Sequence, residues 1–369
     1  MNFLTDVLVF VGVFSVLVFF HEMGHFWVAR LFRVKIDVFS VGFGPTLWSR
    51  TDKKGTNWRI SAVPLGGYVK FFGDANEAST PSPEMEGLSD ADKAACFQFK
   101  PLYQRALIVA AGPIANFVLA IALFTGIFAT IGQSYTSPII TQVLPESAAA
   151  DAGLQPGDHI SSLNGFDIDT FEDIVSYVRI NAEQPVVIEF DRTGRALEST
   201  ATIGFIEYST PFGRVERVGQ LGIGGTERKI IQRGPLEAVW YATIETGNNI
   251  VLVVESLGQF VTGQRAFKEL GGPIKIGEIA GEVARLGIIP LITLTILLSI
   301  NLGVINLLPV PMLDGGHLLF YAIEAIKKKP LGERTQEYGF RIGVAAILTL
   351  MVLVTWNDVT SLIDRLASP

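Results

Sequence analysis

Hydrophobic residues along this chain concentrate in four long runs that are separated by more polar segments. The runs lie at about 4–27, 103–130, 288–310 and 339–356. Each is close to the ~20 residues that a helix needs to cross the hydrocarbon core of a bilayer. The pattern therefore predicts a polytopic α-helical membrane protein with four transmembrane helices.

The segment between the second and third runs has a different pattern. Ile139–Leu144, Val186–Phe190 and Leu197–Ile203 are typical of strands, and Asp191–Gly194 is typical of a hairpin turn. Phe171–Ile180 has the apolar spacing of a short amphipathic helix. These elements predict a small α+β domain.

Residues 235–262 repeat the helical spacing of apolar positions, but they also contain three glutamates. We expect this helix to lie at the membrane surface rather than across the membrane. Two roles are open at this stage, a partly embedded clamp beside an active site or a packing helix for the small domain.

Composition supports the membrane interpretation. Only 18% of the 369 residues are charged, 49% are hydrophobic, and the mean hydropathy is +0.39, whereas soluble domains carry about 25% charged residues. The net charge of −7 argues against nucleic-acid binding. Because Cys96 is the single cysteine, an internal disulfide and a cysteine-based metal cluster are both excluded.

Basic residues predict the orientation. Lys and Arg cluster between the first two runs and again between the last two, and none precedes the first run. The positive-inside rule places both loops in the cytoplasm, so both termini and segment 131–287 are expected outside. The first run lacks a basic n-region and a small-residue cleavage site, which favours a retained helix over a signal peptide.

The first run ends in His21-Glu22-Met23-Gly24-His25. The pattern H-E-x-x-H places two imidazoles on one helix face, where both can bind one zinc ion, with the glutamate as general base. Ionisable groups at membrane depth cost roughly 2.5–3.5 kcal/mol each on insertion scales, so they are seldom without a function. The motif predicts a zinc hydrolase with its active site in the bilayer.

Two histidines leave a catalytic zinc ion one protein ligand short. The strongest candidate for the third is Asp314, in the sequence Asn306–His317 (NLLPVPMLDGGH) at the end of the third run. Two prolines break the helix there, and two glycines after the aspartate permit close backbone approach. The first and third runs both enter from outside, so their ligands are expected at one level, toward the cytoplasmic side. A His₂Asp set with an open position favours zinc among the divalent ions.

Four motifs, taken in order, resemble the site-2 protease family, which is peptidase family M50. They are HEMGH, Gly112–Phe117 (GPIANF), Gly153–Gly165 (GLQPGDHISSLNG) and Asn306–His317. The third of these resembles the signature of PDZ domains in bacterial proteases. The order and spacing are most similar to bacterial members that act as regulator-of-sigma-E proteases, and the resemblance covers essentially the whole chain.

The resemblance implies roles for individual residues. His21, His25 and Asp314 would bind Zn²⁺, and Glu22 would activate the attacking water. Asn306 matches the family asparagine that engages the substrate backbone.

The resemblance also covers the segment between the first two runs. Residues 34–72 match a membrane-associated β-hairpin that presents a substrate strand by edge pairing. Leu65, Gly66 and Gly67 would then lie close to the substrate.

Two other polar residues have open roles. Asn116 in the second run could orient the site through a hydrogen bond, or it could serve only in helix–helix packing by bonding to a neighbouring helix. His317 could lie near the metal, although the family pattern does not require it as a ligand.

The implied activity is that of an intramembrane zinc metalloendopeptidase in the bacterial inner membrane. It would perform regulated intramembrane proteolysis of single-pass membrane proteins, such as anti-sigma factors and signal-peptide remnants, after a first extracytoplasmic cut. The periplasmic PDZ-like domain would capture an extended peptide, unless it is an unrelated small β-domain. Two rival functions are a PDZ-bearing membrane adaptor with a non-catalytic zinc site and, less favoured, a zinc transporter.

The predicted organisation has four parts. Residues 1–130 form a membrane domain with two helices and the hairpin, 131–225 the PDZ-like domain, 226–287 the surface-helix region, and 288–369 a membrane domain with the last two helices. Well-known relatives carry two PDZ modules in tandem, whereas this segment fits one. Residues 205–225 are therefore either a closing strand or a remnant of a second module.

Overall fold

The computed structural model describes residues 3–74, 88–209, 215–225, 228–262, 271–329 and 331–367. The chain forms two compact units. A helical unit comprises Met1–Thr125, Val239–Gly258 and Ala266–Pro369, and a β-rich unit comprises Gly126–Ala238 and Gln259–Arg265. The four predicted segments do not coincide with these units, and their boundaries stay a prediction.

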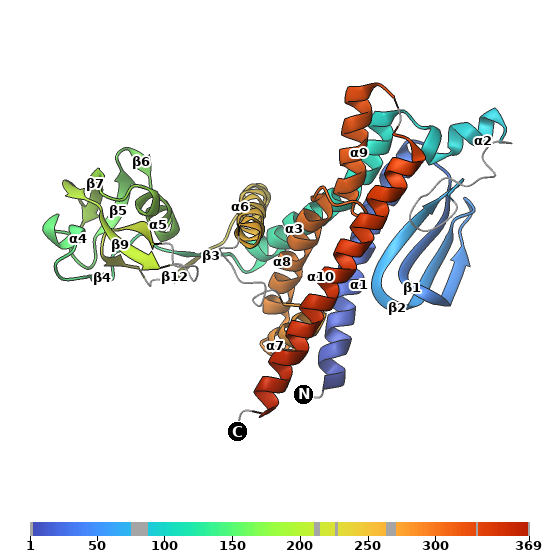
Figure 1. Cartoon of the computed structure of the whole chain (residues 1–369). Coiled ribbons are helices and arrows are strands. Elements are labelled where there is room, and N and C mark those ends of the chain that lie inside the picture. The colour runs from blue at the N-terminus through green and yellow to red at the C-terminus, as the bar shows by residue number, and fades with distance from the viewer. Residues whose placement is uncertain are drawn as a thin grey trace. The chain divides into compact units, whose positions relative to one another are not determined.

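Four helices in the described ranges have the length and apolar composition to cross a membrane. They are α1 (Phe3–Leu31), α3 (Leu102–Thr130), α8 (Ile288–Leu307) and α10 (Glu333–Ala367). Each contains, or nearly contains, one of the four predicted apolar runs. The two termini lie at the same end of the helical unit, and α9 (Asp314–Lys327) lies at the opposite end (Figure 1).

Shorter helices complete this unit, and polar side chains fix one of them. They are α2 (Asp90–Ala95), the 3₁₀ turn η2 (Phe97–Phe99) and α7 (Pro273–Arg285), with most of α6 (Pro235–Val261). Asp358 of α10 is 4% exposed, and its carboxylate accepts hydrogen bonds from the backbone N–H groups of Gly272, Ile274 and Lys275 at the start of α7. Arg285, at the end of α7, donates to both carboxylate oxygens of Asp6 in α1. Both ends of α7 are therefore tied to long helices.

The predicted β-hairpin is present and is folded back on itself. It consists of β1 (Ile36–Thr51) and β2 (Asn57–Phe71). Residues 38–41 of β1 pair with 67–70 on one side and with 57–60 on the other, and residues 46–51 pair with 57–61. The hairpin thus makes four rows in the order 46–51, 57–61, 36–41 and 67–71, and within the described residues the outer edge of the last row pairs with no other strand.

Glycines permit the bend in β1. Gly42 and Gly44 have φ angles of 91° and 82°, a region that glycine enters without steric cost. Inside the bend, the Phe39 ring lies 4.6 Å from the ring of Trp58 and 5.6 Å from that of Phe26 in α1. This cluster of buried Phe26 and Phe39 with half-buried Trp58 fixes the hairpin against α1.

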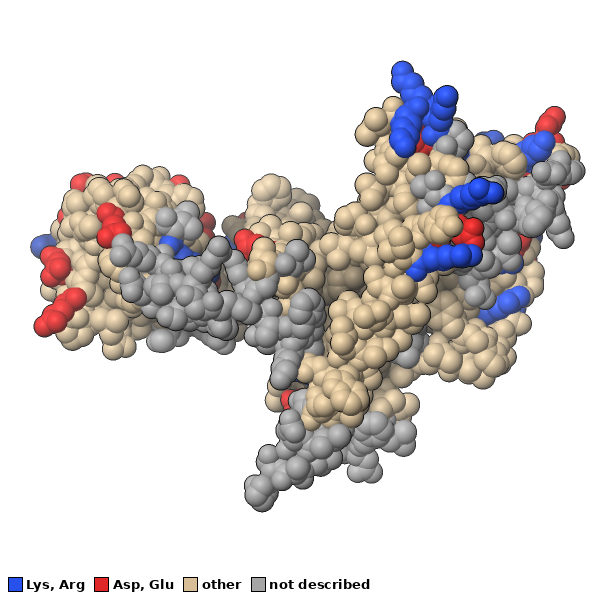
Figure 2. Space-filling view, viewed as in Figure 1, with Lys and Arg blue, Asp and Glu red and all other residues tan. Residues whose placement is uncertain are grey.

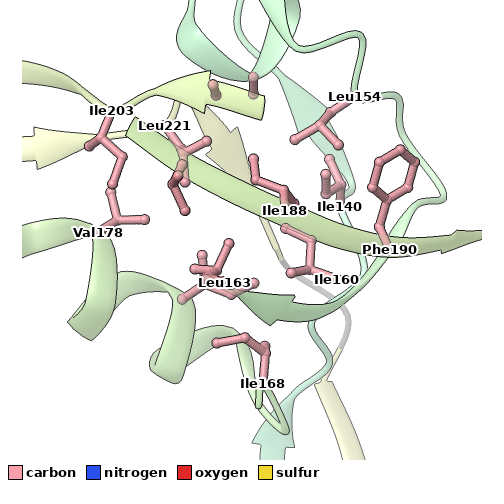
Figure 3. Packing of buried hydrophobic residues seen from close by; sticks show 14 residues of the cluster. Ile140, Leu154, Ile160, Leu163, Ile168, Val178, Ile188, Phe190, Ile203 and Leu221 are labelled. Carbon is pink, nitrogen blue, oxygen red and sulfur yellow. The ribbon is translucent and has the colours of Figure 1, made fainter. Parts of the chain in front are cut away.

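The β-rich unit has a four-stranded antiparallel sheet in the order β6-β5-β7-β8. Its elements are β3 (Gln133–Thr136), β4 (Gln142–Val143), α4 (Ala148–Asp151), β5 (His159–Leu163), β6 (Phe166–Asp167), α5 (Phe171–Ile180), β7 (Pro185–Arg192), β8 (Arg195–Thr202), β9 (Gly204–Ser209), β10 (Val215–Gln220), β11 (Ile223–Gly224) and β12 (Arg228–Ile231). The predicted helix and hairpin turn are found where expected. Aliphatic side chains from the sheet, from α5 and from Leu154 and Leu221 fill the core (Figure 3).

The predicted strand Ile139–Leu144 is wrong over most of its length. Only Gln142–Val143 forms a strand, paired with β11, while Ile139 makes an isolated bridge to His159. Pro138 and Pro145 bracket this stretch and cannot donate ladder hydrogen bonds, which shortens the pairing.

The described residues after β8 close the same domain. Ile203 and Leu221 are buried in its core, and β11 pairs with β4. This favours closing strands over a remnant of a second module.

One ion pair of the Gly153–Gly165 signature is structural. Asp158 accepts two hydrogen bonds from Arg192, at 2.7 and 2.8 Å, and one from the Gln155 backbone at 2.7 Å. Burial alone would raise the pKa of this carboxyl, but these bonds lower it below its usual value. The aspartate of the signature therefore locks the loop onto β7.

Candidate metal centre

The structure brings His21, His25 and Asp314 together in the helical unit. The two histidines lie one turn apart on α1, with 3.3 Å between their Nε2 atoms. Asp314 is the first residue of α9, and its Oδ2 lies 3.2 Å from His21 Nε2 and 3.5 Å from His25 Nε2. Among the described residues, these three form the group that could hold a metal ion.

The chemistry and spacing of this group fit zinc. Ligand atoms about 2.0–2.1 Å from a tetrahedral zinc ion are about 3.3–3.4 Å apart, close to the separations found here. Asp314 Oδ2 is buried and has no hydrogen-bond partner in the described part of the chain. A buried polar atom without a partner calls for an explanation, and a bound cation provides one.

Hydrogen bonds to the far ring nitrogens prepare both histidines for metal binding. His25 Nδ1 donates to the Ile108 carbonyl at 2.9 Å, which leaves the Nε2 lone pair toward Asp314. His21 Nδ1 lies 3.1 Å from the side-chain amide nitrogen of Asn116, and the side-chain oxygen Oδ1 of Asn116 is buried without a hydrogen-bond partner among the described residues. A half-turn of that amide lets the oxygen accept from Nδ1–H, and such a partner fixes the ligating tautomer.

Close packing of α1 on α3 brings these partners into reach. A Cβ at Gly24 would overlap the Ala111 backbone, and a Cβ at Gly112 would overlap the His25 ring and lie 2.9 Å from His21 Cε1. Gly112 and Asn116 are four residues apart, so they share the face of α3 that meets the histidines. The buried Ser299 of α8 donates to the main-chain carbonyl of Asn116 at 2.8 Å and ties a third helix to this contact.

The chain break after α8 positions Asp314. Helix α8 ends at Leu307, and Met312 has a φ of 94°, which is uncommon for a residue with a side chain. A Cβ at Gly315 would overlap the Leu307 and Leu308 carbonyls, and one at Gly316 would overlap that of Val310. The two glycines therefore let α9 begin directly against the loop, as the sequence suggested.

Glu22 lies beside the folded hairpin. Its side chain is 9% exposed and makes no hydrogen bond or ion pair in the described part of the chain. A Cβ at Gly67 would lie 3.0 Å from Glu22 Cγ, so the free-edged row of β2 passes next to this carboxylate. Leu65 and Gly66 precede it on the same strand, and Gly66 has a φ of 129°.

Two other candidates lie outside this group. Asn306 is half-buried in the last turn of α8, and its side chain makes no hydrogen bond within the described residues. His317 lies one turn after Asp314, with its ring 6.5 Å from that of Tyr321, and is not part of the ligand group. The packing role of Gly24 and the hydrogen bond to the Ile108 carbonyl are not predictable from the sequence, because a lone glycine or a backbone oxygen gives no periodic signal.

Replacing Asn116 with alanine is expected to lower zinc affinity about 10–100-fold, the usual cost of losing an outer hydrogen bond to a metal-binding histidine. Zinc content after dialysis against a graded chelator series measures the effect. Asn301→Ala, in α8, removes an asparagine whose side chain, among the described residues, hydrogen-bonds to the Leu297 carbonyl of its own helix and not to the histidines. Equal zinc retention in the two variants would show that Asn116 serves only in helix packing.

Comparison with known structures gives matches to PDZ domains at low overall similarity. The PDZ domain of the SdrC-like protein of Listeria monocytogenes is 18% identical, with a TM-score of 0.20, over 25% of this chain and 88% of that one. The corresponding domain from Listeria innocua is 16% identical, with a TM-score of 0.21, over 26% and 99%. The interpretation of the β-rich unit therefore rests on its own residues.

Comparison of sequences gives matches over nearly the full length. A relative from Agrobacterium fabrum that carries a provisional name as a zinc metalloprotease is 44% identical over 98% of both chains. Metalloprotease MmpA of Caulobacter vibrioides is 39% identical over 94% of this chain and 93% of its own. The model of peptidase family M50 matches residues 9–350. The family resemblance of the motifs is thus confirmed, and the chain belongs to peptidase family M50.

Proposed function

We propose that this protein is a zinc-dependent intramembrane endopeptidase that cleaves single-pass membrane proteins. The observation that carries the proposal is the group formed by His21, His25 and Asp314, with Glu22 adjacent, inside a bundle of apolar helices. A site built for water-soluble substrates would not need to lie among helices of this composition.

The proposed placement has α1, α3, α8 and α10 crossing the bacterial inner membrane, with both termini and the β-rich unit in the periplasm. Two observations support it. The termini lie at one end of the helical unit and α9 at the other (Figure 1). On the face shown in Figure 2, the basic side chains of this unit gather toward the α9 end, as the positive-inside rule requires of a cytoplasmic end.

The proposed chemistry assigns one role to each group. Zinc, when bound, would polarise the scissile carbonyl and make a nucleophile from water at neutral pH. Glu22 takes the proton of the attacking water and delivers it to the leaving amine. His21, His25 and Asp314 hold the metal, and Asn116 and the Ile108 carbonyl keep the two imidazoles in the ligating tautomer.

The substrate must be unwound, because the amides of a transmembrane helix are already hydrogen-bonded to one another. The free edge of residues 67–71 in β2 could pair with the unwound segment, and Gly67 brings that edge beside Glu22. The Asn306 amide, which makes no hydrogen bond among the described residues, is available to bind exposed backbone groups of the substrate. We assign anti-sigma factors and signal-peptide remnants as substrates on the family resemblance, and an extended peptide as the ligand of the PDZ-like unit.

The proposal predicts that the purified protein cleaves a trimmed single-pass substrate, that a zinc chelator stops the cleavage, and that added zinc restores it. Mass spectrometry of the products locates the cut. A cut inside the transmembrane segment supports the proposal, and a cut only in the flanking polar segments contradicts the intramembrane assignment. Binding of the peptide without any cleavage would instead favour a membrane adaptor with a non-catalytic zinc site.

A further inference from the structure

A hollow in the folded hairpin lies away from the metal centre. It is lined by Trp48, Arg50, Thr51, Asp52, Lys53 and Trp58, and its volume is about 330 Å³. Arg50 lies directly opposite Trp58 in the pairing of β1 with β2, so both side chains project to the same face of the sheet. The ring of Trp58 packs against the rings of Phe39 and Phe26. This packing makes one wall of the hollow rigid.

Both carboxylate oxygens of Asp52, the acidic residue of the hollow, already accept two hydrogen bonds each. Oδ2 of Asp52 accepts from Arg30 at 3.0 Å and from Trp58 Nε1 at 3.2 Å, and Oδ1 accepts from the Lys54 and Thr56 backbone at 2.8 and 3.0 Å. Burial alone would raise the pKa of Asp52, but these bonds lower it, so the carboxylate stays ionised and paired. Asp52 therefore shapes the turn and leaves no lone pair for a cation.

The cations of the hollow have no such partners. Arg50 and Lys53 are exposed, and neither makes an ion pair or hydrogen bond within the described residues. The hairpin region 34–72 contains six basic and two acidic residues, a net charge of +4, in a chain whose net charge is −7. A local cationic excess in an acidic protein indicates an anionic ligand.

Exposed apolar side chains on the same hairpin, among them Trp48 of the hollow and its pairing partner Ile60, indicate where that ligand resides. Leu47 is 71% exposed, Trp48 52%, Ile60 51% and Val63 45%. Exposed aliphatic and Trp side chains next to Lys and Arg are typical of a surface that enters the headgroup region of a membrane. A soluble anion would need the cations but would not need this apolar rim.

We propose that this hollow binds the phosphate-bearing headgroup of an anionic phospholipid, with Arg50 and Lys53 on the phosphate and Trp48 against the glycerol and upper acyl region. The inference rests on the membrane placement proposed above. Bound lipid holds rows 46–51 and 57–61 of the hairpin at the cytoplasmic membrane surface. It thereby sets the depth in the membrane of row 67–71, which passes beside Glu22.

The test uses the full-length protein in bilayers of phosphatidylcholine that contain either brominated phosphatidylglycerol or brominated phosphatidylcholine. Bromine quenches nearby tryptophan fluorescence. The difference between wild type and Trp48→Phe reports on lipid at the hollow, and the difference between wild type and Trp356→Phe reports on lipid around α10. We expect phosphatidylglycerol to be preferred at Trp48 by roughly tenfold and to show little preference at Trp356.

Matched variants separate the site from bulk charge. Arg50→Gln with Lys53→Gln is expected to abolish the preference, while Lys327→Gln with Lys329→Gln, which removes two basic residues at the end of α9, keeps it. Persistence of the preference in the first pair, or its absence in wild type, overturns the lipid site. Loss of the preference on adding inorganic phosphate would identify a free-phosphate site and also overturn it. Absence of quenching at Trp356 by either lipid would instead contradict the membrane placement.

Discussion

Glu22→Gln is expected to reduce cleavage of a trimmed single-pass substrate by at least about 100-fold, the lower end of what a positioned general acid–base group contributes. Glutamine has nearly the shape of glutamate but cannot take a proton from water at neutral pH. The Glu22 carboxylate has no other partner in the described part of the chain, so its loss breaks no hydrogen bond or ion pair there. Initial rates of product formation measure the effect.

The control for this variant is the same Glu-to-Gln substitution at an exposed position outside the candidate site. Glu282→Gln, on the exposed face of α7, makes the same substitution and should leave the rate within about twofold. Zinc content and melting temperature should match wild type in both variants, because Glu22 is not in the ligand group. If the Glu22→Gln protein retains full activity with zinc bound, the assignment of Glu22 as general base is wrong.

Local chemistry explains why so much of the site could be predicted. The H-E-x-x-H spacing fixes two ligands on one helix face regardless of what surrounds that helix, and the apolar run around it fixes the kind of environment. Asp314 was predictable because prolines and glycines beside a carboxylate are unusual at the end of an apolar run. Each motif consists of residues that are near one another in the sequence, and the expected orientation of the first and third runs brings the two motifs to one level.

The features that escaped prediction depend on contacts between distant segments. The sequence of residues 34–72 indicates a hairpin. The folding of this hairpin into four rows depends on the packing of Phe39 and Trp58 against Phe26 of α1. The strand predicted at Ile139–Leu144 is short because Pro138 and Pro145 bracket it and because its distant partner, β11, pairs with only two of its residues. Register and partner choice of this kind arise from tertiary packing, which periodicity does not record.

Gly112 belongs to a family motif, but the physical reason for a glycine there appears only in three dimensions. In the sequence it is one glycine before a proline in an apolar helix, where helix propensity alone would favour alanine by about 1 kcal/mol. In the structure, the space that a side chain would occupy is filled by the rings of His25 and His21. The glycine is therefore required by the close approach of the two histidine rings rather than by the helix.

Gly112→Ala is accordingly expected to lower zinc content and to reduce cleavage at least about tenfold, because its Cβ must displace a ligating ring or separate α1 from α3. Gly126→Ala is the matched control, since it lies on the same helix, gains the same helix propensity and has no atom within 4 Å of its new Cβ. That control should keep full zinc content and activity, with a melting temperature equal to or above wild type. Zinc per chain, measured by elemental mass spectrometry beside the cleavage rate, distinguishes a displaced ligand from a general loss of stability. If Gly112→Ala binds zinc and cleaves as well as Gly126→Ala, then His21 and His25 do not form the working site in the arrangement described here.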